Sequence, residues 1–316
     1  MSIKNLLMLP VAATLLITGT FAQEKTGSAS TSKADATTAT ANKVDGDIDE
    51  EITNARMRAA SGSRSKISMS ASLGYDGGSI KDPLSAERPN LSGDPEVLVA
   101  SEFGGSISAR YRANKNDSFT FGAGVSYLQP LQDGDKYADA NEFNVSNPSL
   151  GYSRVYKIGS FQTISGASYT HGTAEGWKRA ELNSIVGVSH TMMHAFKGTG
   201  FSAGFAVSFS VFNNGDIAGL DQSDDTRNRF SLGLFPMAEY QISDTLVART
   251  VFGYFNFRNR RNLGSTDFRR NYEYQSVGIG IVASRDIWIY PNVQFIPDNL
   301  SVDNTNVAVS ATMNLF

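Results

Sequence analysis

The sequence predicts an all-β fold, a twelve-stranded antiparallel transmembrane β-barrel with a short helix before its first strand. Three observations predict it. From Ile67 onward, apolar residues alternate with small or polar ones, no run of about twenty apolar residues follows the N-terminus, and short connections alternate with long ones. Alternation with a period of two gives each strand one apolar face. The mean hydropathy of −0.23 agrees, because only every second strand residue of such a barrel faces lipid.

The N-terminal residues are predicted to form a signal and a linker. Residues 1–22 have the pattern of a secretory signal peptide, with Lys4 at the start, an apolar stretch after it and small residues near Ala22. A membrane anchor is the alternative, but the apolar stretch is short for a span. Residues 23–46 are rich in Ser, Thr and Ala and are predicted to be a disordered linker. The absence of cysteine fits a chain that crosses an oxidising compartment.

Residues 47–62 are predicted to form a short helix. Asp47 or Asp49 can cap its first turn, and Gly62 can end it. A helix of this length is about 22 Å long, close to the apolar band of about 25 Å in a transmembrane barrel. The helix can therefore lie inside the barrel as a plug, or outside it on the periplasmic side.

The barrel is predicted to cover residues 67–316. The strand near 199–213 is the clearest, because Phe201, Phe205 and Phe209 alternate with small residues. An even number of strands places both termini on the side of the short turns. The predicted strands lie near 67–76, 101–113, 117–128, 147–158, 160–172, 182–196, 199–213, 229–242, 245–258, 272–284, 287–296 and 305–316.

These features resemble those of Gram-negative outer-membrane β-barrel proteins. The C-terminal Phe316 is similar to the terminal aromatic residue that the barrel-insertion machinery reads, although Met313 and Leu315 lie on the opposite parity. The resemblance implies an outer-membrane location with both termini in the periplasm. It also implies contact with outer-membrane lipid and lipopolysaccharide, and insertion by that machinery.

The order of a helix followed by twelve strands also resembles the translocator domains of autotransporters. In those domains the helix lies in the pore. The present chain departs from them, because only residues 23–66 lie between the predicted signal peptide and the predicted barrel, which leaves no passenger domain.

The inward positions of the predicted strands are mostly Ser, Gly, Thr and Ala, and a few charges stand among them. If residues 243–245 form a turn, Glu239 lies directly opposite Arg249, and an ion pair follows. Such a pair can simply neutralise two charges inside the barrel, or it can set the ion preference of a constriction. The charged candidates for the lumen are Glu102, Arg110, Arg112, Glu239 and Arg249.

One predicted outer loop is basic, whereas three others are acidic. Three roles are open for it: contact with the acidic neighbouring loops, contact with lipopolysaccharide phosphates, or an inward fold that selects anions. The arginines in or beside this loop, which spans about 258–271, are Arg258, Arg260, Arg261, Arg269 and Arg270.

The sequence predicts a channel and no enzyme. The chain has three histidines, and His171, near Glu175 and Trp177, carries no signature of an outer-membrane phospholipase or protease. We predict no catalytic, cofactor or metal site and no nucleic-acid partner. The predicted function is passive diffusion of small hydrophilic solutes. The alternative is a non-conducting barrel with a role in adhesion or envelope structure, plugged by its helix or its loops.

Overall fold

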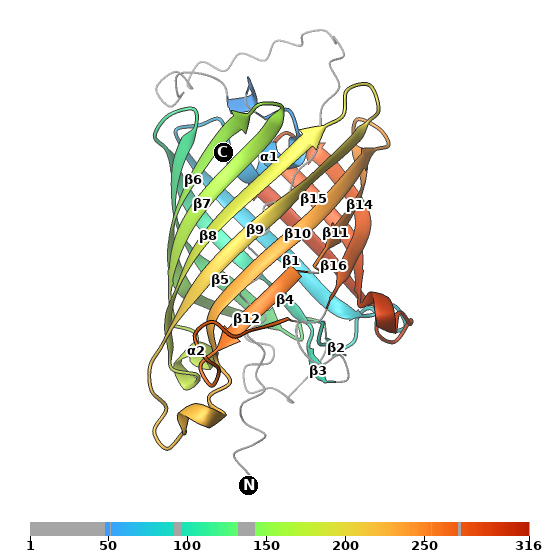
Figure 1. Cartoon of the computed structure of the whole chain (residues 1–316). Coiled ribbons are helices and arrows are strands. Elements are labelled where there is room, and N and C mark those ends of the chain that lie inside the picture. The colour runs from blue at the N-terminus through green and yellow to red at the C-terminus, as the bar shows by residue number, and fades with distance from the viewer. Residues whose placement is uncertain are drawn as a thin grey trace.

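The computed structural model describes residues 48–50, 52–91, 97–131, 143–253, 255–270 and 273–315. The chain forms a closed antiparallel β-barrel (Figure 1). Its main sheet has fourteen strand segments that occupy twelve positions, which confirms the predicted fold. The predicted signal peptide, the predicted linker and Phe316 lie outside the described residues.

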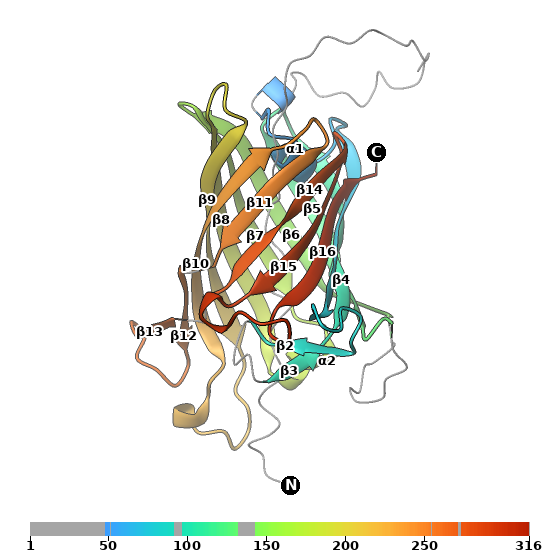
Figure 2. The same ribbon diagram turned by 90° about the vertical axis from the view of Figure 1, so that its right-hand side faces the viewer.

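The barrel closes because the first strand pairs with the last, with Ser70 opposite Asn314 (Figure 2). The barrel strands are β1 (Ile67–Ser79), β4 (Glu102–Arg112), β5 (Asp117–Leu128), β6 (Phe143–Ile158), β7 (Phe161–His171), β8 (Leu182–Ala195), β9 (Phe201–Asn214), β10 (Asn228–Gln241), β11 (Leu246–Phe252), β12 (Phe255–Arg260), β13 (Phe268–Arg270), β14 (Gln275–Ser284), β15 (Ile287–Phe295) and β16 (Asn306–Asn314). The connections carry β2 (Glu87–Pro89), β3 (Leu98–Ala100), α2 (Glu175–Arg179), η5 (Gln222–Asp224) and η6 (Pro297–Asn299).

The ninth strand position differs from the prediction, because it is interrupted after Phe252. The Gly253 amide donates a hydrogen bond to the Tyr274 carbonyl (2.7 Å). A Cβ atom at Gly253 would collide with the Tyr274 ring, so glycine lets these two backbone segments approach closely. Beyond the break, β12 pairs with β10 and β13, while β11 pairs with β10 and β14.

The two ends of the barrel differ in their connections. The turn end carries the short connections 113–116, 159–160, 196–200, 242–245 and 285–286, and β16 also ends there. The loop end carries the long connections, including those that hold α2 and η5 (Figure 1). The predicted alternation of short and long connections is therefore present. β6 begins at Phe143, before its predicted start, and Asn147 has a positive φ of 52° where the pairing with β5 shifts.

Large apolar side chains cover the outer face of the barrel. Phe121, Val145 and Leu150 are 57–63% exposed, whereas inward residues such as Met193 and Met237 are buried. Arg154, which shares this outer face, pairs with Asp117 at the turn end (3.1 Å). No helix in the described ranges is long and apolar enough to cross a membrane.

His190 and His194 lie on the outer face of β8, a strand whose faces the sequence did not define. They share the parity of Val186 and Val188, which are about half exposed. The His190 ring accepts or donates a hydrogen bond to the Ser165 hydroxyl directly across on β7 (2.8 Å). The Ser165 hydroxyl and His190 Nδ1 thereby satisfy each other on an otherwise apolar surface.

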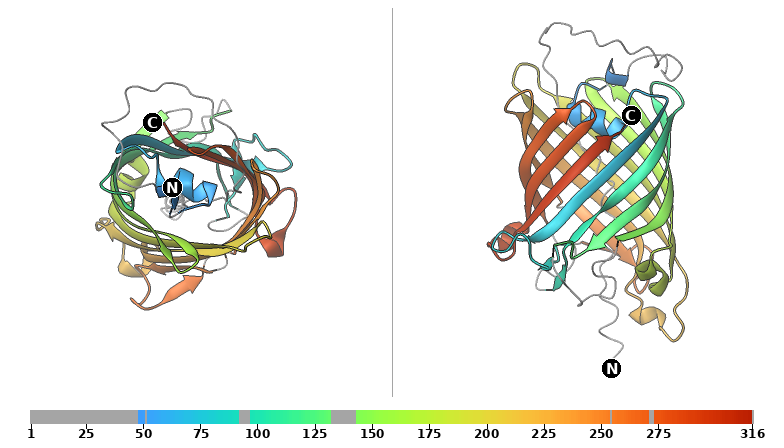
Figure 3. Two further views of the ribbon diagram at one scale, coloured as in Figure 1. Left: turned by 90° about the horizontal axis from the view of Figure 1, so that it is seen from above. Right: turned by 180° about the vertical axis from the view of Figure 1, so that it is seen from behind.

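The inner segment, residues 48–50 and 52–64, begins at the mouth of the turn end and continues inside the barrel (Figure 3). It contains η4 (Ile48–Glu50) and α1 (Ala55–Ser61) in place of the single helix predicted over 47–62. The helix begins later because Thr53 and Asn54 donate their amides to Gln162 Oε1 (2.9 and 3.0 Å). The Asn54 side chain then caps α1 through the Met57 amide (3.1 Å).

Candidate functional site at the turn end of the barrel

Apolar side chains of the inner segment pack against the inner wall of the barrel. Ile52 and Met57 are fully buried in a cluster with Met193, Phe235 and Met237. Close packing of this kind excludes water, so the centre of the turn end is filled with side chains. On the other side of α1, Ala55 and Ala59 of the helix form a second cluster with residues of β11 and β15. These residues are Val247, Trp288 and Tyr290.

A glycine on β14 makes room for this second cluster. Trp288 is 1% exposed, and a Cβ atom at Gly280 would collide with its indole ring. Gly280 therefore leaves room for the indole beside β14, and the indole belongs to the same buried cluster as Ala55 and Ala59 of α1. The strand sequence thus sets how close the helix comes to the wall.

A buried charge cluster holds the N-terminal part of α1. Glu239 Oε1 lies 3.2 Å from both Arg56 Nη1 and Arg249 Nε, and all three side chains are at most 6% exposed. Asn54 Nδ2 donates to the other carboxylate oxygen (3.4 Å), and the Arg249 guanidinium lies 4.8 Å from the Tyr290 ring centroid. Removing one partner from such a buried cluster is costly, since the remaining charge is left without compensation.

Arginines of β4 hold the C-terminal end of α1. Arg110 donates to the carbonyls of Ser61 (2.7 Å) and Ala60 (3.3 Å). Arg112 donates to the carbonyls of Ser61 (2.9 Å) and Ser63 (2.7 Å). The last carbonyls of a helix have no partner within the helix and carry its partial negative charge, so cations bind them favourably.

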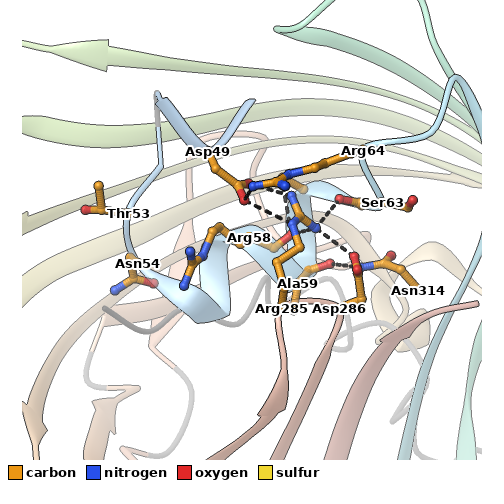
Figure 4. A network of polar contacts seen from close by, with 12 residues as sticks. Asp49, Thr53, Asn54, Arg58, Ala59, Ser63, Arg64, Arg285, Asp286 and Asn314 are labelled. Carbon is orange, nitrogen blue, oxygen red and sulfur yellow. Dashed lines mark hydrogen bonds and ion pairs between the residues drawn. The ribbon is translucent and has the colours of Figure 1, made fainter. Parts of the chain in front are cut away.

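Arg285, in the turn between β14 and β15, completes this set of contacts (Figure 4). It donates to the carbonyls of Gly62 (2.7 Å) and Arg58 (3.3 Å). Its Nη2 and Nε atoms also donate to the two carboxylate oxygens of Asp49, at 2.7 and 3.2 Å. The inner segment is therefore attached to the turn end by both its main chain and a carboxylate.

Asp49 is shared between two arginines. Arg64 Nη2 lies 2.6 Å from Asp49 Oδ2, the oxygen that also accepts a hydrogen bond from Arg285 Nε. Burial by itself raises the pKa of Asp49, but the hydrogen bonds and charges of Arg285 and Arg64 outweigh burial and lower the pKa below its ordinary value. The carboxylate is thus held ionised at neutral pH.

The structure brings together four of the five charged residues predicted for the lumen. Arg110 and Arg112 contact the inner segment, and Glu239 faces Arg249 in the register expected from the turn at 243–245. Glu102 lies apart, toward the loop end, opposite Asp76 of β1.

Sequence reasoning missed several residues of the site. The sequence predicts no role for Arg56, which lies within the range of the predicted helix, or for Arg285, which lies between two predicted strands. Gln162 and Asn314, whose amide donates to the Ala59 carbonyl (2.7 Å), carried no signal. These partners lie more than one hundred residues from the inner segment, so only the closed barrel brings them to it.

At the loop end, one arginine of the basic loop joins two loops. Arg261 contacts Asp216 (2.8 Å) and Asp225 (2.7 Å), and Asp225 also pairs with Arg227 (2.7 Å). Burial by itself raises the pKa of Asp225, but the bonds and charge of Arg227, together with the charge of Arg261, lower it overall.

The other predicted arginines of this loop are not part of that contact. Arg258 and Arg260 lie on β12, and Arg269 and Arg270 lie on β13, where Arg270 pairs with Glu273. The basic loop is therefore divided between a contact to its neighbour and an exposed basic strand segment.

Comparison with known proteins finds likeness in fold only. No protein-family model matches the sequence, and no curated protein sequence matches it. An outer-membrane channel from Pseudomonas putida F1 is similar with 11% identity and a TM-score of 0.48, over 80% of this chain and 97% of that chain. The KdgM porin has 11% identity and a TM-score of 0.41, over 78% and 99%. The NanC porin has 8% identity and a TM-score of 0.41, over 78% and 97%. These three solved structures are an outer-membrane channel and two porins.

Proposed function

We propose that this protein is an outer-membrane channel for small hydrophilic solutes that is closed at its turn end by the inner segment. Solutes diffuse through the barrel when this segment moves. The observation that carries the proposal is the way the inner segment is held. It is attached by side-chain contacts to β4, β7, β10 and β16 and to the turn before β15, rather than being part of the barrel wall.

The lining of the barrel supports a channel. Toward the loop end from the inner segment, inward positions are small or polar, for example Ser208 and Ser210 on β9 and Ser276 on β14. A twelve-stranded barrel is wider than an eight-stranded one, whose interior side chains alone can fill. With the inner segment displaced, small residues would leave a polar path.

The outer face supports a membrane location. Its band of exposed apolar side chains suits lipid. We propose that the turn end faces the periplasm, because short periplasmic turns and longer outer loops are typical of outer-membrane barrels. We propose that Phe316 serves as the insertion signal for the barrel-insertion machinery. We also propose that the exposed Arg269 and Arg270 at the loop end contact lipopolysaccharide phosphates.

A second candidate function is a non-conducting barrel with a surface or structural role. The packing of the inner segment favours it, because Ile52 and Met57 are as fully buried as residues of a permanent core. The two functions differ in one respect: the intact form of a channel opens, whereas a permanently plugged barrel conducts only once the inner segment is removed.

Single-channel conductance in a planar bilayer tests the proposal. We expect the chain without residues 48–64 to conduct steadily, and the intact chain to show rare openings. A chain that lacks an equal length of the linker, residues 27–43, is the matched control and should behave like the intact chain. Silence of the 48–64 deletion, from protein that shows the heat-dependent gel mobility of a folded barrel, would exclude the channel. Openings of the deletion variant alone would favour the permanently plugged barrel.

A further inference from the structure

We propose that Arg110, Arg112 and Arg285 form a binding site for an anionic group of a solute, a carboxylate or a phosphate, which the inner segment occupies in the closed barrel. The inference rests on the proposed channel function. It names the class of solute that the channel prefers and the event that releases the inner segment.

The three arginines converge on one place. Arg110 and Arg112 both donate to the carbonyl oxygen of Ser61, and Arg285 donates to the carbonyl of the next residue, Gly62. The three guanidinium groups are close enough for the charges of Arg112 and Arg285 to act on Arg110. Like charges are gathered in this way only where something negative lies between them.

Among the described contacts, the partners of the three arginines are mainly peptide carbonyls, and the carboxylates of Asp49 and Asp286 lie beside Arg285 alone. Within the described ranges, Arg110 has only the carbonyls of Ser61 and Ala60 as hydrogen-bond partners, and no carboxylate pairs with it. Helix-end carbonyls carry a partial charge equivalent to about half an electron. A full anion carries about twice that charge, so a guanidinium attracts it more strongly at the same distance. The site is therefore better suited to an anion than to its present occupant.

The contact between Arg285 and Asp49 shows the chemistry that the site accepts. The two nitrogens of Arg285 face the two oxygens of the Asp49 carboxylate, which is the geometry of bidentate carboxylate recognition. Asp49 belongs to the inner segment, so this carboxylate leaves the site together with the segment. A carboxylate or phosphate of a solute can then take the place of both Asp49 and the Ser61 carbonyl.

Solute binding and release of the inner segment are therefore competing events. An anion that binds the arginines displaces the C-terminal part of the segment from them. When the segment binds the arginines again, it displaces the anion. Since the two exclude each other, an anionic solute shifts the barrel toward its open form in proportion to its affinity for the open site.

Ion selectivity of the open barrel tests the site. In the chain without residues 48–64, the reversal potential in a tenfold KCl gradient should show a several-fold preference for chloride over potassium. Replacing both Arg110→Gln and Arg112→Gln should reduce that preference severalfold. Arg154→Gln removes one such charge from the outer face and should leave the preference unchanged. An unchanged reversal potential in the double variant would overturn the proposal.

Release of the inner segment is tested in the full chain. Because the chain has no cysteine, Thr53→Cys can carry a single environment-sensitive fluorophore on an exposed position of the segment. With the ionic strength held constant, the concentration of inorganic phosphate that changes the emission should be at least several-fold lower than the concentration of KCl that does so. The Arg110→Gln and Arg112→Gln variant should lose the difference between the two salts. Equal responses to phosphate and KCl in the original chain would contradict the proposal.

The two kinds of failure can be told apart. If the deletion variant does not conduct, the channel function fails, and the fluorescence titration alone decides whether the arginines bind anions. If the deletion variant conducts without preference for anions, and phosphate acts no better than KCl, the channel function stands and the anion site is refuted.

Discussion

Glu239 is the carboxylate that joins the inner segment to the barrel wall, because Arg56 of α1 and Arg249 of β11 share it. In the described part of the chain, one negative group thus faces two positive groups. The inner segment is therefore held in place by a few charges that have almost no access to water.

Replacement of this carboxylate tests the lock. Glu239→Gln keeps the shape of the side chain but removes the negative charge that both arginines contact, at a cost of about 3–5 kcal/mol. We expect a lower unfolding temperature and more frequent openings in the bilayer. Glu175→Gln, at an exposed position of α2, should change neither. Wild-type stability and conductance of the Glu239 variant would show that the cluster does not hold the segment.

Acid should weaken the contact between Asp49 and Arg285. The folded-state pKa of Asp49 is lowered from its ordinary value of 3.8, so the contact stabilises the closed form above pH 3.8 and is lost as pH falls through the lowered pKa. Conductance of the intact chain should therefore rise as the pH is lowered below about 4. The Asp49→Asn variant should conduct more than the original chain at neutral pH. Its conductance should not show the rise that protonation of Asp49 causes at low pH. An identical pH profile in both proteins would contradict the assignment.

At the scale of elements, the position of α1 depends on how β14 and β15 pack. Gly280 leaves the space that Trp288 fills, and Trp288 in turn supports Ala55 and Ala59. The turn at 243–245 likewise sets the register of β10 and β11, and this register was predictable because a short turn fixes which residues face each other.

A methyl group on β14 should disturb the helix. Gly280→Ala forces the buried indole of Trp288 toward α1, and overpacking of this kind costs about 1–3 kcal/mol. We expect a lower unfolding temperature and, in the fluorescence assay, a segment that phosphate releases more readily. Gly176→Ala on α2, where a Cβ atom meets nothing within 4 Å, is the matched control. Unchanged release of the segment in the Gly280→Ala protein would show that Trp288 does not support α1.

At the loop end, the contact between the two loops depends on Asp225. Asp225→Asn removes the charge that Arg227 and Arg261 share, so the loops around 214–228 and 258–271 should separate more often. Limited proteolysis of the intact chain should then cut these loops faster, while conductance stays the same. Asp221→Asn, on an exposed residue of the same loop, should leave the cleavage rate as it is. Equal cleavage of both variants would show that Arg261 does not tie the loops.

At the scale of the whole molecule, the sequence predicts the wall of the barrel better than its contents. Alternation along the strands and the lengths of the connections follow local rules, so the twelve positions and the two different ends could be predicted. The split of the inner segment into η4 and α1 could not, because Gln162, which holds Thr53 and Asn54 in an extended form, lies 108 and 109 residues away. The break at Gly253 has the same cause, a contact with Tyr274 across strands.

The central claim is that the inner segment closes the barrel and moves when it opens. A reversible crosslink tests it most directly: Ala59→Cys with Asn314→Cys, placed where the Asn314 amide reaches the Ala59 carbonyl in the cysteine-free chain. With the disulfide verified by mass spectrometry, we predict silence in the bilayer while it is oxidised and channel openings after reduction. Openings of equal size and frequency in the oxidised and reduced protein would contradict closure by the inner segment.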